Sequence, residues 1–185
     1  MRIIQITVLT LAIISTVACE VRLAPSEYFA RIFKTQTDTK YYQGKAQALM
    51  ANLAENAEEY DINRIAVLDL VDEEGRTPIL GEYLSERMIE EITRRKQFRV
   101  THKGEVLEAL NQLALKPSYL YTREDIQSLG KALNSQALLT GKLTDLGTNL
   151  DVHLTLIDVM TGEVIASASE HLTRTRFAVE MLRHF

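Results

Sequence analysis

The sequence predicts an α/β domain with a single mixed β-sheet of about five strands and helices packed on it. Helical stripes alternate with short apolar runs in the first half of the chain, which implies crossover connections and parallel pairing. The last three apolar runs are joined by tight turns, which implies an antiparallel three-stranded meander. The chain has 185 residues, of which 46% are apolar and 25% are charged. This composition is typical of one folded domain and excludes a disordered chain.

The first four elements alternate between helix and strand. Apolar residues at helical spacing predict a helix over residues 42–60, and the nearly continuous apolar run 65–71 predicts a buried strand. The charged segment 72–76 ends this strand. An amphipathic helix is expected over 79–96, and its Glu- and Arg-rich face is interpreted as solvated surface rather than a docking site. Residues 98–100 are expected to form a brief second strand.

Two helices separate this strand from the next. An apolar stripe over residues 106–113 predicts the first of them, which the Lys-Pro break at 116–117 closes. Thr122 and Asp125 have the spacing of a capping box at the start of the second. The apolar run 137–141 then predicts the third strand.

The final elements show period-two alternation. Residues 150–156 alternate apolar and polar side chains, as expected of a half-buried strand, and a turn at 160–162 leads to a similar strand at 164–168. An apolar stripe at helical spacing predicts a terminal helix over 177–185. This stripe could pack on the domain or face a neighbouring subunit. The expected order is therefore α-β-α-β-α-α-β-β-β-α.

Three glycines lie inside predicted elements. Gly81 and Gly130 fall in helical segments, where a missing side chain allows close packing or marks a helix end. Gly141 falls in the third strand, where a glycine suggests a β-bulge. All three are expected to be structural.

The N-terminus has the order of a secretory signal. Arg2 gives a short positive region, residues 3–14 carry no formal charge and are mostly apolar, and residues 15–18 are smaller. The stretch from 3 to 18 is shorter than the roughly 20 residues that a transmembrane helix needs. Residues 1–18 are therefore interpreted as a signal peptide and set aside from the fold.

The only cysteine follows directly. Thr16-Val17-Ala18-Cys19 resembles a bacterial lipobox, in which cleavage leaves the cysteine N-terminal and diacylated on sulfur. The alternative is a cysteine that ends an ordinary signal peptide or an uncleaved anchor helix. Lipidation of Cys19 would hold the protein on a membrane without a spanning helix, because each buried methylene contributes about 0.8 kcal/mol. Glu20 follows the cysteine where Asp would favour the inner membrane, and this favours the outer membrane.

Residues 19–41 are interpreted as a lipidated N-terminus and flexible tether, and residues 42–185 as a single α/β domain. The formal net charge is −4, from 21 Lys and Arg against 25 Asp and Glu. This balance argues against a nucleic-acid partner and against a polybasic lipid-binding surface. Membrane attachment is therefore expected through Cys19 alone.

Acidic residues gather after the first predicted strand, at Asp69, Asp72, Glu73 and Glu74. The carboxyl end of a strand is a common ligand position in α/β sheets, and these carboxylates could hold Mg²⁺ or Ca²⁺. A solvated acidic turn is the favoured interpretation, because no EF-hand or other ligand spacing is present. No metal and no cofactor are therefore expected.

Other catalytic patterns are missing from the sequence. The histidines are scattered and form no His-x-x-x-His pair; they are His102, His153, His171 and His184. There is no Gly-x-Ser-x-Gly elbow, and a P-loop at Gly141-Lys142 fails because Gln136 and Leu143 replace required residues. No catalytic residue is expected.

An ordered series of sequence blocks carries a family resemblance. The blocks are residues 65–70, 80–86, 98–100, 129–141 and 152–164. This series, which covers roughly residues 60–172, resembles the FlgO family of flagellar outer-membrane lipoproteins. It is more distantly similar to the curli secretion protein CsgG and to the penicillin-binding-protein activator LpoB. The resemblance implies a fold like that of the N-terminal domain of TolB and a docking or assembly role without catalytic residues.

The expected protein is thus a lipid-anchored outer-membrane module that faces the periplasm of a Gram-negative cell and binds its partners without catalysis. Flagellar or other surface-appendage assembly is the expected process, with an envelope protein or a second copy of the chain as partner. Regulation of peptidoglycan synthesis is the first alternative, although the tether 19–41 is short for a distant enzyme. A metal- or nucleotide-binding envelope enzyme that uses the 69–74 segment is the second.

Overall fold

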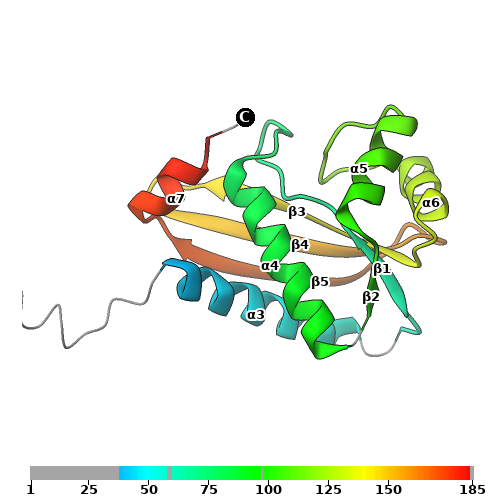
Figure 1. Ribbon diagram of the computed structural model, residues 1–185, viewed down its shortest axis with the longest axis horizontal. Coiled ribbons are helices and arrows are strands. Elements are labelled where there is room, and N and C mark those ends of the chain that lie inside the picture. The colour runs from blue at the N-terminus through cyan, green and yellow to red at the C-terminus, as the bar shows by residue number, and fades with distance from the viewer. Residues whose placement is uncertain (1–37, 58–59, 97, 184–185) are drawn as a thin grey trace, which may run out of the picture. The chain divides into compact units, whose positions relative to one another are not determined.

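The computed structural model describes residues 38–57, 60–96 and 98–183, and the order of its elements is the predicted one (Figure 1). The helices are α3 (Asp38–Ala57), α4 (Ile79–Arg95), α5 (Lys103–Gln112), α6 (Arg123–Ala132) and α7 (Arg176–Met181). The strands are β1 (Arg64–Val67), β2 (Arg99–Val100), β3 (Ala137–Asp145), β4 (Asn149–Asp158) and β5 (Val164–Thr173).

The five strands form one mixed sheet in the order β2-β1-β3-β4-β5. β1 pairs in parallel with both β2 and β3, because helices connect these strands. β3, β4 and β5 form the predicted antiparallel meander. The predicted α/β class with a single mixed sheet is confirmed.

Helices cover both faces of the sheet. α3, α4 and α7 pack on one face, and α5 and α6 pack on the other. The side chains of β1 and of the residue after it alternate between these two cores: Ile65 and Val67 point to the first, and Ala66 and Leu68 to the second. This two-sided burial explains why the run reads as continuously apolar rather than alternating.

Regular pairing of β1 ends at Val67, earlier than the predicted end of this strand. The chain nevertheless stays beside β3, since the N–H of Leu68 donates to the carbonyl of Leu139 at 2.9 Å and Val71 forms an isolated parallel bridge with Lys142. α3 begins at Asp38, so the helix includes residues before the predicted start.

Two glycines are explained by close packing. A Cβ on Gly141 would lie 2.6 Å from side-chain atoms of both Leu154 and Leu70, and Gly141 pairs regularly with Leu154. The predicted bulge at Gly141 is therefore wrong, and the irregularity of the meander lies between Leu156 and Ile157 of β4. A Cβ on Gly81 would lie 2.2 Å from the carbonyl oxygen of Leu70, so this glycine lets α4 sit against the segment after β1.

Side-chain contacts test two predictions about helices in the second half of the chain, α6 and α7. The capping box of α6 is present, with the Asp125 N–H donating to Thr122 Oγ1 at 3.2 Å and the Thr122 N–H donating to the Asp125 carboxylate at 3.1 Å. α7 packs on the domain, because the ring of Phe177 lies 5.4 Å from that of Tyr42 and 6.1 Å from that of Tyr83.

Candidate functional site

The predicted lipidation site, Cys19, and the fourth histidine, His184, lie outside the described residues. Cys19 lipidation therefore remains a prediction. Within the part of the chain that the structure describes, no helix has the length and apolarity needed to cross a membrane.

The acidic residues after β1 do not converge on one point. Asp69 accepts a hydrogen bond from Ser85 Oγ at 2.5 Å and lies 3.2 Å from Lys103 Nζ. Asp72 instead closes its own turn, accepting from the N–H groups of Glu74 at 2.8 Å and Arg76 at 2.9 Å. No three His, Cys, Asp or Glu side chains are arranged to hold a metal ion within the described segments. Residues 72–76 therefore form an acidic turn closed by hydrogen bonds to Asp72, whereas Asp69 pairs with side chains of α4 and α5.

The turn is also matched in charge. The guanidinium of Arg76 lies 3.0 Å from the Asp72 carboxylate and 2.8 Å from that of Glu74. Partial burial alone would raise the pKa of Asp72, but the N–H groups and the guanidinium of Arg76, with the N–H of Glu74, outweigh burial and lower this pKa.

The three described histidines have separate structural surroundings. His102 is the N-cap of α5, where its Nδ1 accepts from the Gly104 N–H at 3.1 Å. His153 lies 2.8 Å from Ser169 Oγ across two strands of the meander, and His171 lies 3.0 Å from Asp151. None of these arrangements brings two histidines to one ligand position.

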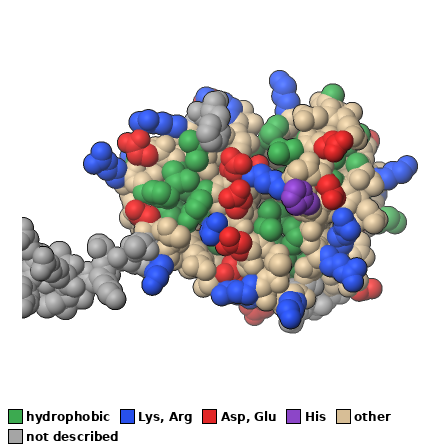
Figure 2. Space-filling view, in the orientation of Figure 1, with side chains coloured by type: hydrophobic (Ala, Val, Ile, Leu, Met, Phe, Trp, Pro, Cys, Tyr) green, Lys and Arg blue, Asp and Glu red, His purple; other side chains and the backbone are tan. Residues whose placement is uncertain are grey.

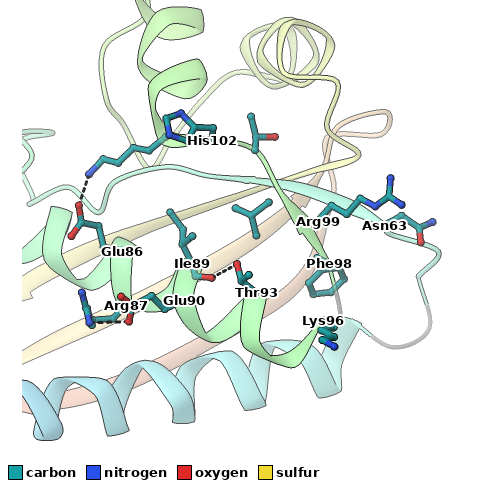
Figure 3. A pocket seen from close by; sticks show the side chains of 13 residues that line it. Asn63, Glu86, Arg87, Ile89, Glu90, Thr93, Lys96, Phe98, Arg99 and His102 are labelled. Atoms are coloured by element: carbon teal, nitrogen blue, oxygen red, sulfur yellow. Dashed lines mark hydrogen bonds and ion pairs between the residues drawn. The ribbon is translucent and has the colours of Figure 1, made fainter.

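An open groove with a volume of about 1010 Å³ lies between the outer face of α4 and the sheet edge at β2 (Figure 3). We call it the β2 groove. Its apolar lining comes from Ile89 of α4 and from Phe98 and Val100 of the β2 segment. In Figure 2, carboxylates follow α4 between two apolar patches, and basic side chains gather on the side where β2 lies.

The carboxylates of the α4 wall are already paired with cations. Lys103 lies 2.8 Å from Glu82 and 3.8 Å from Glu86, and Arg87 lies 2.8 Å from Glu90. Partial burial would lower the pKa of Lys103, but hydrogen bonds and charge from Glu82 and Asp69 outweigh it and raise this pKa. The α4 wall therefore has little net charge to offer a ligand.

The β2 wall differs, because its basic side chains have no acidic partner. Lys96 ends α4 in the left-handed conformation with φ of 56°, Arg99 is the first residue of β2, and His102 follows that strand. All three are exposed, and none forms a salt bridge with a side chain in the described ranges. The groove thus combines an apolar floor with unmatched positive charge.

These residues were not singled out by the sequence pattern, although a signal exists. Six of the ten residues from 94 to 103 are Arg, Lys or His, in a chain of net charge −4. The interpretation of the 79–96 helix as ordinary surface describes its paired carboxylates correctly but overlooks the groove. The groove exists only because β2 lies beside this helix in the fold.

The solved structures that this chain is similar to include two LpoB domains and a TolB protein. The LpoB C-terminal domain of Salmonella enterica is 18% identical, with 72% of this chain and 98% of that chain covered and a TM-score of 0.59. The corresponding domain of Escherichia coli is 16% identical, with the same coverage and a TM-score of 0.56. TolB from Acinetobacter baumannii is 18% identical over 64% of this chain and 25% of that chain, with a TM-score of 0.38. None of the curated proteins matches the sequence.

The two LpoB domains share the fold of this chain, with two helical layers around a mixed sheet. The family model described as FlgO protein matches residues 43–177, a region that begins in α3 and ends in α7. This match confirms the resemblance carried by the ordered sequence blocks. Because the matched region spans well over half of the sequence, the chain belongs to the FlgO family.

Proposed function

We propose that this protein is a lipid-anchored accessory module of the Gram-negative envelope that acts by binding rather than by catalysis. It is attached through Cys19 to the periplasmic face of the outer membrane and takes part in flagellar or other surface-appendage assembly. The observation that carries the proposal is the match to the FlgO family over residues 43–177. The β2 groove supports it as a surface on which a partner can dock. The anchor raises the local concentration of the domain near its partner without any added contact.

The anchor is tested by fractionating cells that express the wild-type chain or Cys19→Ala. The wild-type protein is expected with outer membranes, and its intact mass should equal that of residues 19–185 plus acyl groups. The variant is expected to leave the outer-membrane fraction, because it lacks the acyl chains that hold the domain there. Full sedimentation of Cys19→Ala with membranes, or an unmodified mass that includes residues 1–18, contradicts the anchor.

The partner is identified by photo-crosslinking in cells. A photoreactive phenylalanine at Thr93, which lines the β2 groove, is compared with the same residue at Ser128, which is exposed on α6. A flagellar or appendage protein captured at Thr93 and not at Ser128 supports the proposal. Capture of a penicillin-binding protein at the same position would replace it with the alternative role in peptidoglycan synthesis.

A further inference from the structure

We propose that the β2 edge binds an extended acidic segment of a partner protein by strand addition. This inference rests on the proposed function as a binding module and names the chemistry of the segment that is bound. Three observations carry it: the open backbone of β2, the apolar floor of the β2 groove, and the unmatched cations beside it.

The backbone of β2 is used on one side only. The N–H of Arg99 donates to the carbonyl of Asn63 at 2.8 Å, and the N–H of Thr101 donates to that of Ile65 at 3.0 Å. Successive residues of a strand direct their backbone groups to alternate sides, so Val100 directs its N–H and C=O away from β1. β2 is the terminal strand of the sheet, and no described group pairs with these two atoms of Val100. An edge of this kind is a template for one more strand.

The groove provides a place for the side chains of an added strand. Phe98 and Val100 are half-buried against the core that α4 covers. Ile89 lines the groove from α4, across from Phe98 (Figure 3). Side chains of a strand alternate between two faces, so every second residue of the added segment would point toward this apolar floor. The floor favours an aliphatic residue at those positions.

Charge selects the remaining positions. Glu86 and Glu90 of α4 are neutralised within the domain, whereas Lys96 and Arg99 have no carboxylate partner within the described segments. Acidic side chains between the aliphatic ones would meet these cations, and opposite charge across an interface also accelerates association. A second copy of the chain is a poorer fit through its other edge. Glu170, the one acidic residue of β5, already pairs with Lys45, so that edge offers no unmatched carboxylate to Lys96 and Arg99, and self-association becomes an outcome of the test.

The test uses the full-length protein in detergent and two fluorescent nine-residue peptides. One peptide alternates Asp and Val, and the other alternates Lys and Val. The Asp peptide is expected to bind at least about tenfold more tightly than the Lys peptide, a preference that 0.5 M salt should largely remove. Hydrogen exchange should show protection of the Val100 N–H in the complex. Equal binding of both peptides, binding of neither, or protection confined to β5 overturns the proposal.

Two kinds of variant separate backbone pairing from charge. Val100→Pro removes the outward N–H but leaves the ladder bonds of Arg99 and Thr101, and proline is tolerated on an edge strand. It should weaken Asp-peptide binding at least about tenfold relative to Val100→Ala, which keeps the N–H. The charge-reversal pair Lys96→Glu with Arg99→Glu should cause a similar loss even if Val100→Pro unfolds. Lys116→Glu with Lys131→Glu makes the same charge change away from the groove and should leave binding unchanged.

The outcomes distinguish this inference from the proposed function. If neither peptide binds but photo-crosslinking at Thr93 still captures an appendage protein, strand addition is wrong and the binding role stands. If the Asp peptide promotes dimers of the chain instead of occupying β2, the edge serves self-association and the acidic-partner proposal fails.

Discussion

The two edges of the sheet are built differently. β5 is a strand of ten residues with α3 packed along it, whereas β2 has only two residues and borders an open groove (Figure 1). At the β5 edge, the Thr173 N–H donates to Tyr41 Oη at 2.7 Å, so a side chain of α3 occupies a backbone donor. At the β2 edge, the outward N–H and C=O of Val100 have no such partner among the described residues.

Charge follows the same division. Beside β5, Lys45 lies 2.5 Å from Glu170, and Arg174 lies 3.1 Å from Asp145. Beside β2, Lys96 and Arg99 have no acidic partner in the described part of the chain. The comparison teaches that the β5 edge has paired charges and a backbone donor occupied by α3, whereas the β2 edge keeps a backbone donor and cations available. A docking partner is therefore expected at β2, and changes at β5 should alter stability rather than binding.

The largest expected effect comes from disturbing the packing of α4, the helix that lines the β2 groove. Gly81→Ala should lower the free energy of unfolding by about 2 kcal/mol, because its Cβ would lie 2.2 Å from the backbone oxygen of Leu70. Urea unfolding measures the loss. Gly44→Ala in α3 is the matched control, since nothing outside the neighbouring backbone of its own helix lies within 4 Å of the added Cβ. This variant should raise the free energy of unfolding by up to about 1 kcal/mol. Equal stability of the two variants would show that α4 is not seated tightly.

The second prediction concerns the contact between α3, which packs along β5, and α4, which lines the β2 groove. Glu91 of α4 is 2% exposed, accepts from Gln47 Nε2 of α3 at 3.1 Å and lies 2.6 Å from Arg94. Glu91→Ala should lower the free energy of unfolding by about 1 to 2 kcal/mol, because it leaves a cavity and removes the hydrogen-bond acceptor of Gln47. Glu91→Leu should cost clearly less, since apolar replacements of buried charges are often near neutral. Urea unfolding of both variants decides, and an equal cost would mean that the hydrogen bond is specifically required.

The sequence predicts those parts of the fold whose signal lies within a single helix or strand. Period-two alternation predicted β4, helical stripes predicted α4 and α5, and the Thr122–Asp125 spacing predicted a cap that the structure contains. Such signals come from residues close together in the sequence, so they can be recognised without knowing which residues they contact in the fold. Gly141 was misread because its requirement comes from Leu70 and Leu154, which the chain places against it only after folding.

The candidate site was less accessible for the same reason. The motif at Cys19 is linear and could be read directly, whereas the β2 groove is assembled from α4 and an edge strand that is two residues long. Whether a charge is matched also depends on tertiary contacts. Lys103 and Arg99 look alike in the sequence, but only Lys103 meets Asp69 and Glu82.

A smaller effect is expected at the β5 edge. Tyr41→Phe removes the hydroxyl that accepts from the Thr173 N–H and donates to Thr173 Oγ1 at 3.2 Å. The loss should be about 0.5 to 1 kcal/mol, because water can replace part of an exposed hydrogen bond. Amide hydrogen exchange should become faster at Thr173 and stay unchanged at Val100. Faster exchange at Val100 would mean that the two edges are coupled.

The smallest effect tests the charge matching beside β5 through its pH dependence. Asp145, in the last position of β3, accepts from Arg174 Nε at 3.1 Å and from the Gly147 N–H at 2.8 Å. The hydrogen bond from Arg174, followed by that from Gly147, lowers the pKa of Asp145 below its usual value. The stabilisation is therefore present above the unfolded pKa of about 3.9 and is lost as pH falls through the lower folded pKa.

Asp145→Asn should accordingly cost less than about 1 kcal/mol at pH 7, since the pair with Arg174 is largely exposed. The wild type and the variant should converge in stability below the folded pKa of Asp145, where the carboxylate is protonated. Urea unfolding at pH 7, 4 and 2.5 measures the convergence, and added salt should reduce the difference at pH 7. A difference that stays constant with pH would mean that Asp145 acts as a turn-forming hydrogen-bond acceptor and not as a charge. In that case the contrast between the two edges would rest on backbone pairing and on the unmatched cations of β2 alone.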